Sequence, residues 1–289
     1  RNNIAGTWSV AQTPEKYATI KEAMENALKG KATLLYTQGC NIWRNRQLQK
    51  NGEFDKPLNW GDENELKKEA LKIAKEADVI VCAMGESADM SGECGSRTNL
   101  EMPDVQHELL AELVKLGKPV VLLNFAGRPT VLSWEKQYVP AIMNVWFGGS
   151  EMGDALCDVI FGDKVPSGKL TTSMPKTTGQ APIYYNHQNT GRPVPDDNKE
   201  FAKYASNCLD VSNGPLYPFG YGLSYTTFEY SNFKLSSQEA DINGNQEATE
   251  WQNGKKITAT VTVKNTGARD ADEVVQLYIR DMVASISRP

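Results

Sequence analysis

Three short, continuously apolar runs, separated by helical patterns, constrain the fold of this chain most strongly. The runs are "DVIVCAMG" (78–85), "KPVVLLNFAG" (118–127) and "PAIMNVWFGG" (140–149). Continuous apolar runs of this length are typical of strands that are covered on both faces. Repeated strand–helix units therefore predict an α/β fold, with a mostly parallel sheet sandwiched by helices and right-handed crossovers.

The segments around these runs have helical spacing. Before the first run, apolar residues recur three or four positions apart, at Leu66, Ala70, Ile73, Ala74 and Ala77. Pro103 is placed to begin the next helix and Gly117 to end it. A further helix is predicted for "SEMGDALCDVIFG" (150–162).

The pattern changes after about residue 225. "KKITATVTVKNTG" (255–267) and "DEVVQLYIRD" (272–281) alternate apolar and polar residues, and "NTG" predicts a turn between two paired strands. The polar segment 236–254 is expected to form a loop. Residues 226–289 are fewer than the about 100 residues of an immunoglobulin-like sandwich. We therefore predict an α/β domain over 1–225 and a partial all-β sandwich over 226–289.

Composition excludes several classes of protein and site. The chain has 289 residues, 40% of them hydrophobic, and a net charge of −5, which disfavours nucleic acid and anionic membranes as partners. No apolar run approaches the about 20 residues of a membrane helix. The first residue is not methionine, so we expect a segment or a processed product.

Cysteine and histidine usage disfavours a disulfide framework or a metal centre. The chain has 5 cysteines without a CxxC pair, and only 2 histidines. Cys82 and Cys157 lie in apolar patterns and are expected in the core.

The loop "GESADMSGECGSRTNLEMP" (85–103) follows the first buried run and contains Glu86 and Glu93. Ligands of open α/β sheets bind beyond the carboxyl ends of the strands, which is where this loop begins. Solvated loop carboxylates are nevertheless the commoner explanation for such residues. No GxGxxG or GxxxxGK[ST] motif supports a nucleotide site, and "GLSYT" is not a nucleophile elbow.

Longer motifs carry a family resemblance. "NFAGRP", "VWFGGSEMGDALCDVIFGDKVPSGKLTTSMP", "YYNHQNTGRP" and "LYPFGYGLSYTTFEYS" follow the 85–103 loop in one order. Together they resemble the C-terminal half of glycoside hydrolase family 3, closest to its periplasmic bacterial β-glucosidases. The resemblance implies an α/β sandwich followed by part of a fibronectin type III-like domain, and a barrel domain elsewhere in the same protein.

The resemblance also implies a role for the loop. Retaining hydrolysis in this family uses an aspartate nucleophile on the barrel and a glutamate acid/base on the α/β sandwich. The matching residue here is Glu93, and Gly92 and Gly95 would let the loop bend toward the barrel. A general acid must stay protonated near neutral pH, which partial desolvation or a neighbouring negative charge achieves.

Other candidates have secondary roles. Glu86 competes with Glu93, but it follows the strand directly, and we interpret it as a loop-orienting carboxylate paired with Arg97. Trp8, and also Trp43, could stack on a sugar, although most tryptophans are packing residues.

Further along the chain we expect packing or loop roles. Trp146 and Phe147 are expected in the core. His187, Asn189 and Arg192 are expected in a hydrogen-bonded loop that could border a cleft. Tyr217, Phe219 and Tyr221 are expected at a packed joint between the domains.

The resulting hypothesis is part of an exo-acting retaining β-glucosidase, periplasmic or secreted, that acts on β-glucosides or oligosaccharides. No metal or organic cofactor is implied. A β-xylosidase or another exo-glycosidase of the same family is the alternative enzyme. A non-catalytic carbohydrate-binding or scaffolding domain and a flavodoxin-like nucleotide binder are the alternatives from other classes; retention of Glu93 argues against the first, and the missing phosphate loop against the second.

Overall fold

The structure is a computed structural model of the chain. It describes residues 3–9, 13, 16–53, 57–188, 190–195, 197–198, 200–236, 238–239 and 257–279. The α/β part contains helices α1 (Ile20–Leu28), α2 (Arg46–Asn51), α3 (Glu63–Glu76), α4 (Asp104–Val114), α5 (Ser133–Tyr138) and α6 (Met152–Ile160), and strands β1 (Ile80–Gly85), β2 (Val120–Phe125) and β3 (Ala141–Asn144). Short 3₁₀ turns lie at η2 (Ala88–Met90) and η3 (Thr178–Gln180), and a second group of strands comprises β4 (Phe228–Leu235), β5 (Gln238–Glu239) and β6 (Ala259–Asn265).

The predicted apolar runs form a parallel sheet. Its three described strands are ordered β1-β2-β3, with Ile80 opposite Val120 and Gly85 opposite Phe125. Strand β3 continues the sheet in the same direction, with Asn144 opposite Asn124. All three carboxyl ends therefore lie on one edge, next to the loops that follow them.

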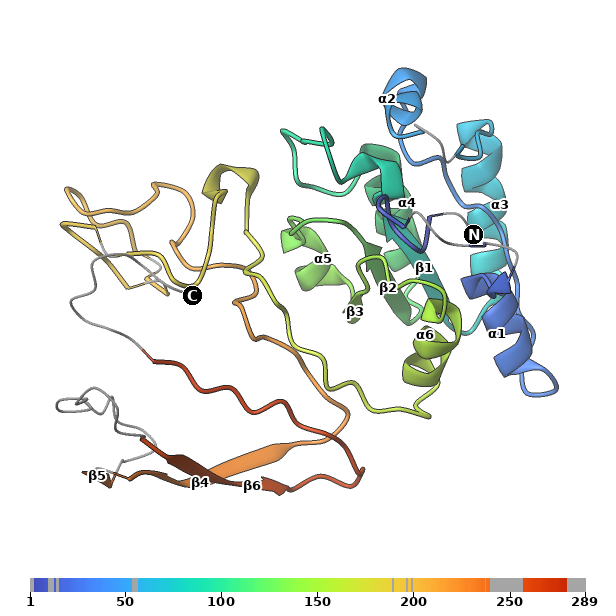
Figure 1. Cartoon of the computed structure of the whole chain (residues 1–289). Coiled ribbons are helices and arrows are strands. Elements are labelled where there is room, and N and C mark those ends of the chain that lie inside the picture. The colour runs from blue at the N-terminus through green and yellow to red at the C-terminus, as the bar shows by residue number, and fades with distance from the viewer. Residues whose placement is uncertain are drawn as a thin grey trace.

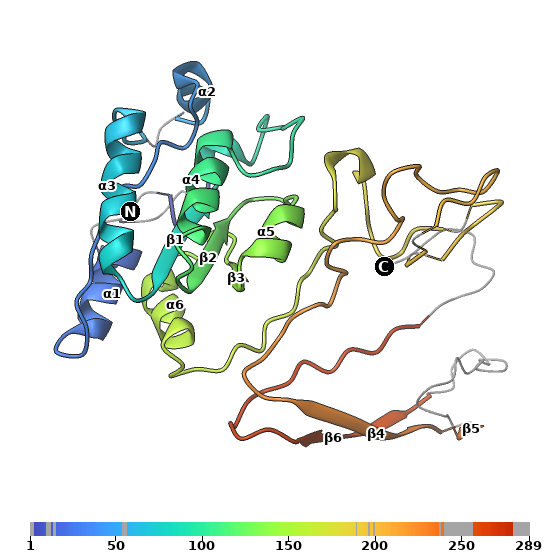
Figure 2. The same cartoon turned by 180° about the vertical axis from the view of Figure 1, so that it is seen from behind.

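Helices cover both faces of this sheet (Figures 1 and 2). On one face, α3 and α4 pack on β1 and β2 through a cluster that includes Ala70, Leu110 and Leu122. On the other face, α6 packs on Leu123 of β2, and α1 packs beside α6. The predicted α/β sandwich is confirmed, and the continuous apolar runs reflect burial from both sides.

Local signals in the sequence mark the boundaries of α3 and α4. Asp62 caps α3 by accepting hydrogen bonds from the backbone N–H groups of Asn64 and Glu65, both at 3.0 Å. Helix α4 begins directly after Pro103 and ends three residues before Gly117, which has a φ of 70°. The predicted boundaries of α4 are thus confirmed.

The buried cysteines were predicted correctly. Cys82 and Cys157 are both buried free thiols. Burial raises the pKa of Cys82 to about 12, so this side chain remains an uncharged core residue at neutral pH.

The predicted hairpin around "NTG" is wrong. Strand β6 pairs antiparallel with β4, Phe228 opposite Asn265, and β5 pairs with the other edge of β4. The chain does turn at Thr266 and Gly267, but the residues that follow do not return along β6. The cross-strand partner of β6 precedes it in the chain, beyond a polar segment that lies mostly outside the described residues.

The predicted strand at 272–281 is also wrong for its described part, residues 272–279, which pairs with no strand there. This segment is held by side chains instead. Glu273 accepts a hydrogen bond from the Tyr230 hydroxyl at 2.7 Å, and Gln276 donates to the carbonyl oxygen of Gly220 at 3.0 Å. The alternating pattern indicates an extended chain, but a ladder also needs a neighbouring strand, and none is placed there among the described residues.

No helix in the described part of the chain is both long and apolar enough to cross a membrane.

Candidate active site

The site is built at the carboxyl end of β1, where the chain leaves the sheet at Gly85. This glycine has a φ of 124°, and a Cβ atom there would lie 2.0 Å from the carbonyl oxygen of Phe125. The Gln106 side chain accepts from the N–H of Gly85 at 2.6 Å and donates to its carbonyl oxygen at 2.9 Å. The backbone of Gly85 is therefore held by two hydrogen bonds to Gln106. The close approach of Phe125 leaves no room for a Cβ atom at this position.

Glu86 follows and points into the protein. It is 4% exposed, and its carboxylate contacts Nη1 of Arg97 at 2.8 Å. Its second oxygen accepts from the backbone N–H of Gly127 at 3.1 Å. The predicted Glu86–Arg97 pair is confirmed, and this carboxylate is enclosed by protein groups rather than open to a substrate.

Arg97 links this pair to the aromatic side chain of Trp43. Its Nη2 donates to the carbonyl oxygen of Glu101 at 2.9 Å, and its guanidinium carbon lies 5.2 Å from the Trp43 ring centroid. Trp43 is half-buried at this place. The arrangement supports the interpretation of Arg97 as a residue that holds the loop.

Glu93 lies at the tip of the loop and is exposed. Gly92 has a φ of 95° and Cys94 a φ of 59°, so the chain is in the left-handed region on both sides of Glu93. The N–H of Gly95 closes the turn onto the carbonyl oxygen of Gly92 at 3.2 Å. Within the described residues, the Glu93 carboxyl forms no hydrogen bond or ion pair, which leaves it open to solvent.

Arg128, from the loop after β2, anchors the two stems of this turn. Its Nη2 donates to the carbonyl oxygens of Met90 and Gly95, the latter at 2.6 Å. Its Nε lies 2.9 Å from Glu86, an ion-pair contact whose angle does not suit a hydrogen bond. The sequence prediction missed this residue, although its place directly after the neighbouring buried strand, in "NFAGRP", was an available signal.

The N-terminal segment approaches the same loop. The Thr7 hydroxyl donates to the carbonyl oxygens of Ala88 and Ser91, the latter at 2.9 Å. Trp8 is next in the chain and is 66% exposed. The structure therefore brings the backbone of Trp8 close to the base of the acidic loop and leaves most of its side chain exposed.

Other residues considered from the sequence have different surroundings. Arg192 donates to the carbonyl oxygen of Tyr204 at 3.1 Å and His187 is exposed, both in the loop region 182–206. Asn189 lies outside the described residues. Trp146 and Phe147 follow the end of β3 and are only half-buried, so the prediction that they lie in the core was wrong.

All three aromatic residues expected at a joint make ring contacts, and one of them, Phe219, contacts a ring of the segment after residue 272. Phe219 stacks on Tyr185 with ring centroids 4.4 Å apart and meets Tyr278 edge-on at 6.3 Å. Tyr217 and Tyr221 pack together at 4.9 Å. The chain before residue 225 and the segment after residue 272 are thus in direct contact.

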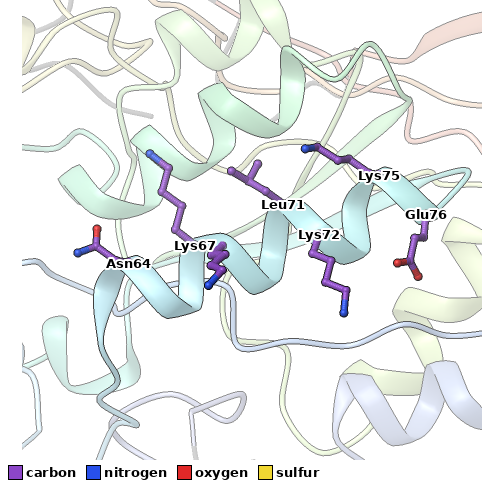
Figure 3. A pocket seen from close by; sticks show the side chains of 7 residues that line it. Asn64, Lys67, Leu71, Lys72, Lys75 and Glu76 are labelled. Atoms are coloured by element: carbon purple, nitrogen blue, oxygen red, sulfur yellow. The ribbon is translucent and has the colours of Figure 1, made fainter.

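A groove along α3 shares no lining residue with this loop (Figure 3). Its lining is mostly basic and consists of Asn64, Lys67, Lys68, Leu71, Lys72, Lys75 and Glu76. Among the described residues, no group of three or more His, Cys, Asp or Glu side chains could hold a metal ion.

Comparison with known proteins identifies the family. The sequence profile of the glycosyl hydrolase family 3 C-terminal domain matches residues 1–225. The chain belongs to glycoside hydrolase family 3. The resemblance noted from the motifs is thereby confirmed.

Relatives of this family 3 chain are considerably longer. A periplasmic β-glucosidase of Salmonella typhimurium is 41% identical over 100% of this chain and 36% of its own length. A β-xylosidase of Formosa agariphila is 35% identical over 95% of this chain and 33% of its own length. The chain thus spans about a third of the curated relatives it matches.

A solved structure has the same fold. The β-glucosidase from Listeria innocua in complex with isofagomine aligns with a TM-score of 0.77 and 33% identity, over 100% of this chain and 36% of that one. The α/β arrangement of residues 1–225 is therefore that of the family 3 C-terminal domain.

Proposed function

We propose that this chain is the acid/base-bearing part of a retaining, exo-acting β-glucosidase, and that Glu93 is the general acid/base. The observation that carries the proposal is the contrast between Glu86 and Glu93, the two candidates for the role. Glu86 is enclosed by two guanidinium groups, whereas Glu93 is presented to solvent at the tip of an anchored turn. Only the second carboxyl is free to reach a glycosidic oxygen.

In this mechanism Glu93 first protonates the departing oxygen and then removes a proton from the attacking water. The nucleophile that forms the covalent glycosyl intermediate comes from an N-terminal barrel domain of the same protein. Closure of that domain over Glu93 provides the desolvation that keeps a general acid protonated near neutral pH. Trp8, exposed beside the loop, forms part of the aglycone site.

The domain organisation belongs to the same proposal. Residues 1–225 form the α/β domain with the acid/base loop, and residues 226–289 form part of a fibronectin type III-like sandwich. The described strands β4, β5 and β6 support an all-β second part.

The substrate is a β-glucoside or β-linked oligosaccharide, and the similarity to a periplasmic relative supports a periplasmic location.

A β-xylosidase is the second candidate, because a relative with that name matches 95% of this chain. The two candidates use the same acid/base chemistry. Comparing kcat/KM for aryl β-glucoside and aryl β-xyloside with the full-length protein distinguishes them.

The role of Glu93 is tested by leaving-group dependence in the full-length protein. Glu93→Gln should lower kcat/KM for cellobiose by about 10²–10⁴-fold, because a sugar hydroxyl leaves poorly without a proton. Glycosylation by dinitrophenyl glucoside should fall much less, and the slow second step should give a burst. Azide needs no general base, so it should restore turnover and yield β-glucosyl azide.

Glu101→Gln is the matched control, since Glu101 is an exposed carboxylate of the same loop. It should leave both substrates unchanged. Equal losses on both substrates in Glu93→Gln, without a burst or azide rescue, would remove Glu93 from the mechanism. A purely carbohydrate-binding protein would show turnover of neither substrate in any variant.

A further inference from the structure

We infer that Arg128 is a positioning residue that holds the turn carrying Glu93 in place for proton transfer. The inference rests on the proposed acid/base role of Glu93. Arg128 lies on a different loop from Glu93. It would affect the reaction only indirectly, by holding the turn that carries Glu93.

The two loops interlock at the carboxyl edge of the sheet. Strands β1 and β2 are neighbours, so the loops after them start side by side. A Cβ atom on Gly127 would lie 2.1 Å from the hydroxyl oxygen of Ser91, and the N–H of Gly127 donates to Glu86. The backbone just before Arg128 is therefore already fixed against the loop of Glu93.

The Arg128 guanidinium then joins the two stems of the turn. One nitrogen, Nη2, donates hydrogen bonds to the carbonyl oxygen of Met90 on one stem and to that of Gly95 on the other. Nε faces the carboxylate of Glu86 at 2.9 Å, and the side chain is only 18% exposed. The two N–H groups of Nη2 can each donate to one of these carbonyls, while Nε keeps the positive charge of the guanidinium next to Glu86.

Glu93 depends on this anchor more than an ordinary loop residue would. Its own carboxyl has no hydrogen-bond or ion-pair partner among the described residues, so its direction follows from the backbone of the turn. That backbone is left-handed at Gly92 and Cys94, between the two anchored carbonyls. Loosening either stem would let the turn relax, and a displacement of about 1 Å can cost about 10²-fold in rate.

The test uses Arg128→Lys in the full-length protein. Lysine keeps a positive charge near Glu86, which favours folding, but its single nitrogen cannot occupy both the position of Nη2, which donates to the two carbonyls, and that of Nε, which lies beside Glu86. We expect kcat/KM for cellobiose to fall by about 10–10²-fold, while glycosylation by dinitrophenyl glucoside changes by less than about threefold. Azide should recover part of the lost turnover, as for Glu93→Gln.

A double-mutant cycle separates positioning from general damage. If Arg128 acts through Glu93, then Arg128→Lys should cost less than about twofold on cellobiose when Glu93→Gln is already present. Arg269→Lys is the matched control. Its Nη2 also donates to a backbone carbonyl, that of Gly162 at 3.1 Å, in a part of the chain far from the loop in sequence.

Each outcome bears on a different claim. Equal losses on both substrates in Arg128→Lys, or a full loss on cellobiose persisting in the Glu93→Gln background, would overturn the inference and leave the role of Glu93 intact. A Glu93→Gln variant without leaving-group dependence would instead remove the proposed role of Glu93, and the inference with it. The expected pattern supports both.

Discussion

Glu86 and Glu93 are the same residue type on the same loop, yet their surroundings give them opposite roles. The side chain of Glu86 is 1% exposed and is compensated by Arg97 and Arg128, whose side chains are 10% and 18% exposed. Charges buried in this way are retained at a desolvation cost, and removing one partner leaves the others uncompensated. Glu93 carries no such cost, because water solvates its carboxyl.

We therefore predict that Glu86→Gln destabilises the α/β domain strongly. The substitution leaves two guanidinium groups near a neutral amide, and breaking a buried ion pair typically costs about 3–5 kcal/mol. Urea unfolding followed by circular dichroism measures the free energy of unfolding. Glu112→Gln is the control, because Glu112 forms its ion pair with Lys115 at an exposed site. A similar unfolding midpoint for both variants would contradict the prediction.

At the scale of elements, the edge formed by β1 and β2 depends on very close backbone contact. Gly85 and Phe125 are opposite one another in the parallel ladder, and the N–H of Glu86 donates to the Phe125 carbonyl oxygen at 2.7 Å. The side chain of Gln106, from α4, closes the same corner. Helix, strand and loop thus meet where the acidic loop begins.

Gly85→Ala should disturb this corner. The left-handed backbone costs about 1–2 kcal/mol for alanine, and the clash with Phe125 adds a further overpacking cost of about 1–3 kcal/mol. Gly117→Ala provides the control, since Gly117 has a φ of 70° but no atom within 4 Å of a Cβ. Denaturant unfolding should show the greater loss for Gly85→Ala. Equal losses of unfolding free energy in the two variants would show that the contact between the new Cβ atom and Phe125 adds no destabilisation.

At the scale of the whole molecule, the proposed mechanism needs two carboxylates, of which this chain would supply Glu93. Its family 3 relatives are longer, and the chain covers 36% of the periplasmic β-glucosidase it matches. Several apolar side chains after the α/β part are largely exposed, including Leu277 at 62% and Ile279 at 93%. Both features are consistent with a chain that functions as part of a larger protein.

The chain of residues 1–289 alone is therefore expected to have no measurable β-glucosidase activity. Purified protein incubated with an aryl β-glucoside should release no phenol above background, because the covalent intermediate has no nucleophile on which to form. The full-length protein, assayed in parallel, is the positive control. Turnover by the chain alone that survives repurification and disappears in Glu93→Ala would contradict this prediction.

The sequence by itself determined the parallel strands, three of the helices around them (α3, α4 and α6) and the position of the acidic loop. Those features follow from local patterns: continuous apolar runs for β1 and β2, helical spacing of apolar residues for α3, and Pro103 and Gly117 around α4. The family motifs singled out Glu93 among the loop carboxylates, and its catalytic role stays a prediction. Local patterns suffice here because they need no knowledge of a distant partner.

Only the tertiary structure decided which residues support that loop and how the later strands pair. Arg128 reaches Met90 and Gly95 because β2 lies beside β1, and Trp8 approaches because Thr7 binds the loop from the other end of the chain. Strand β6 pairs with β4 rather than with the segment after the turn, although both patterns alternate equally well. Hydrogen bonds between strands and charges buried across loops depend on which segments meet in space, and periodicity within one segment does not contain that information.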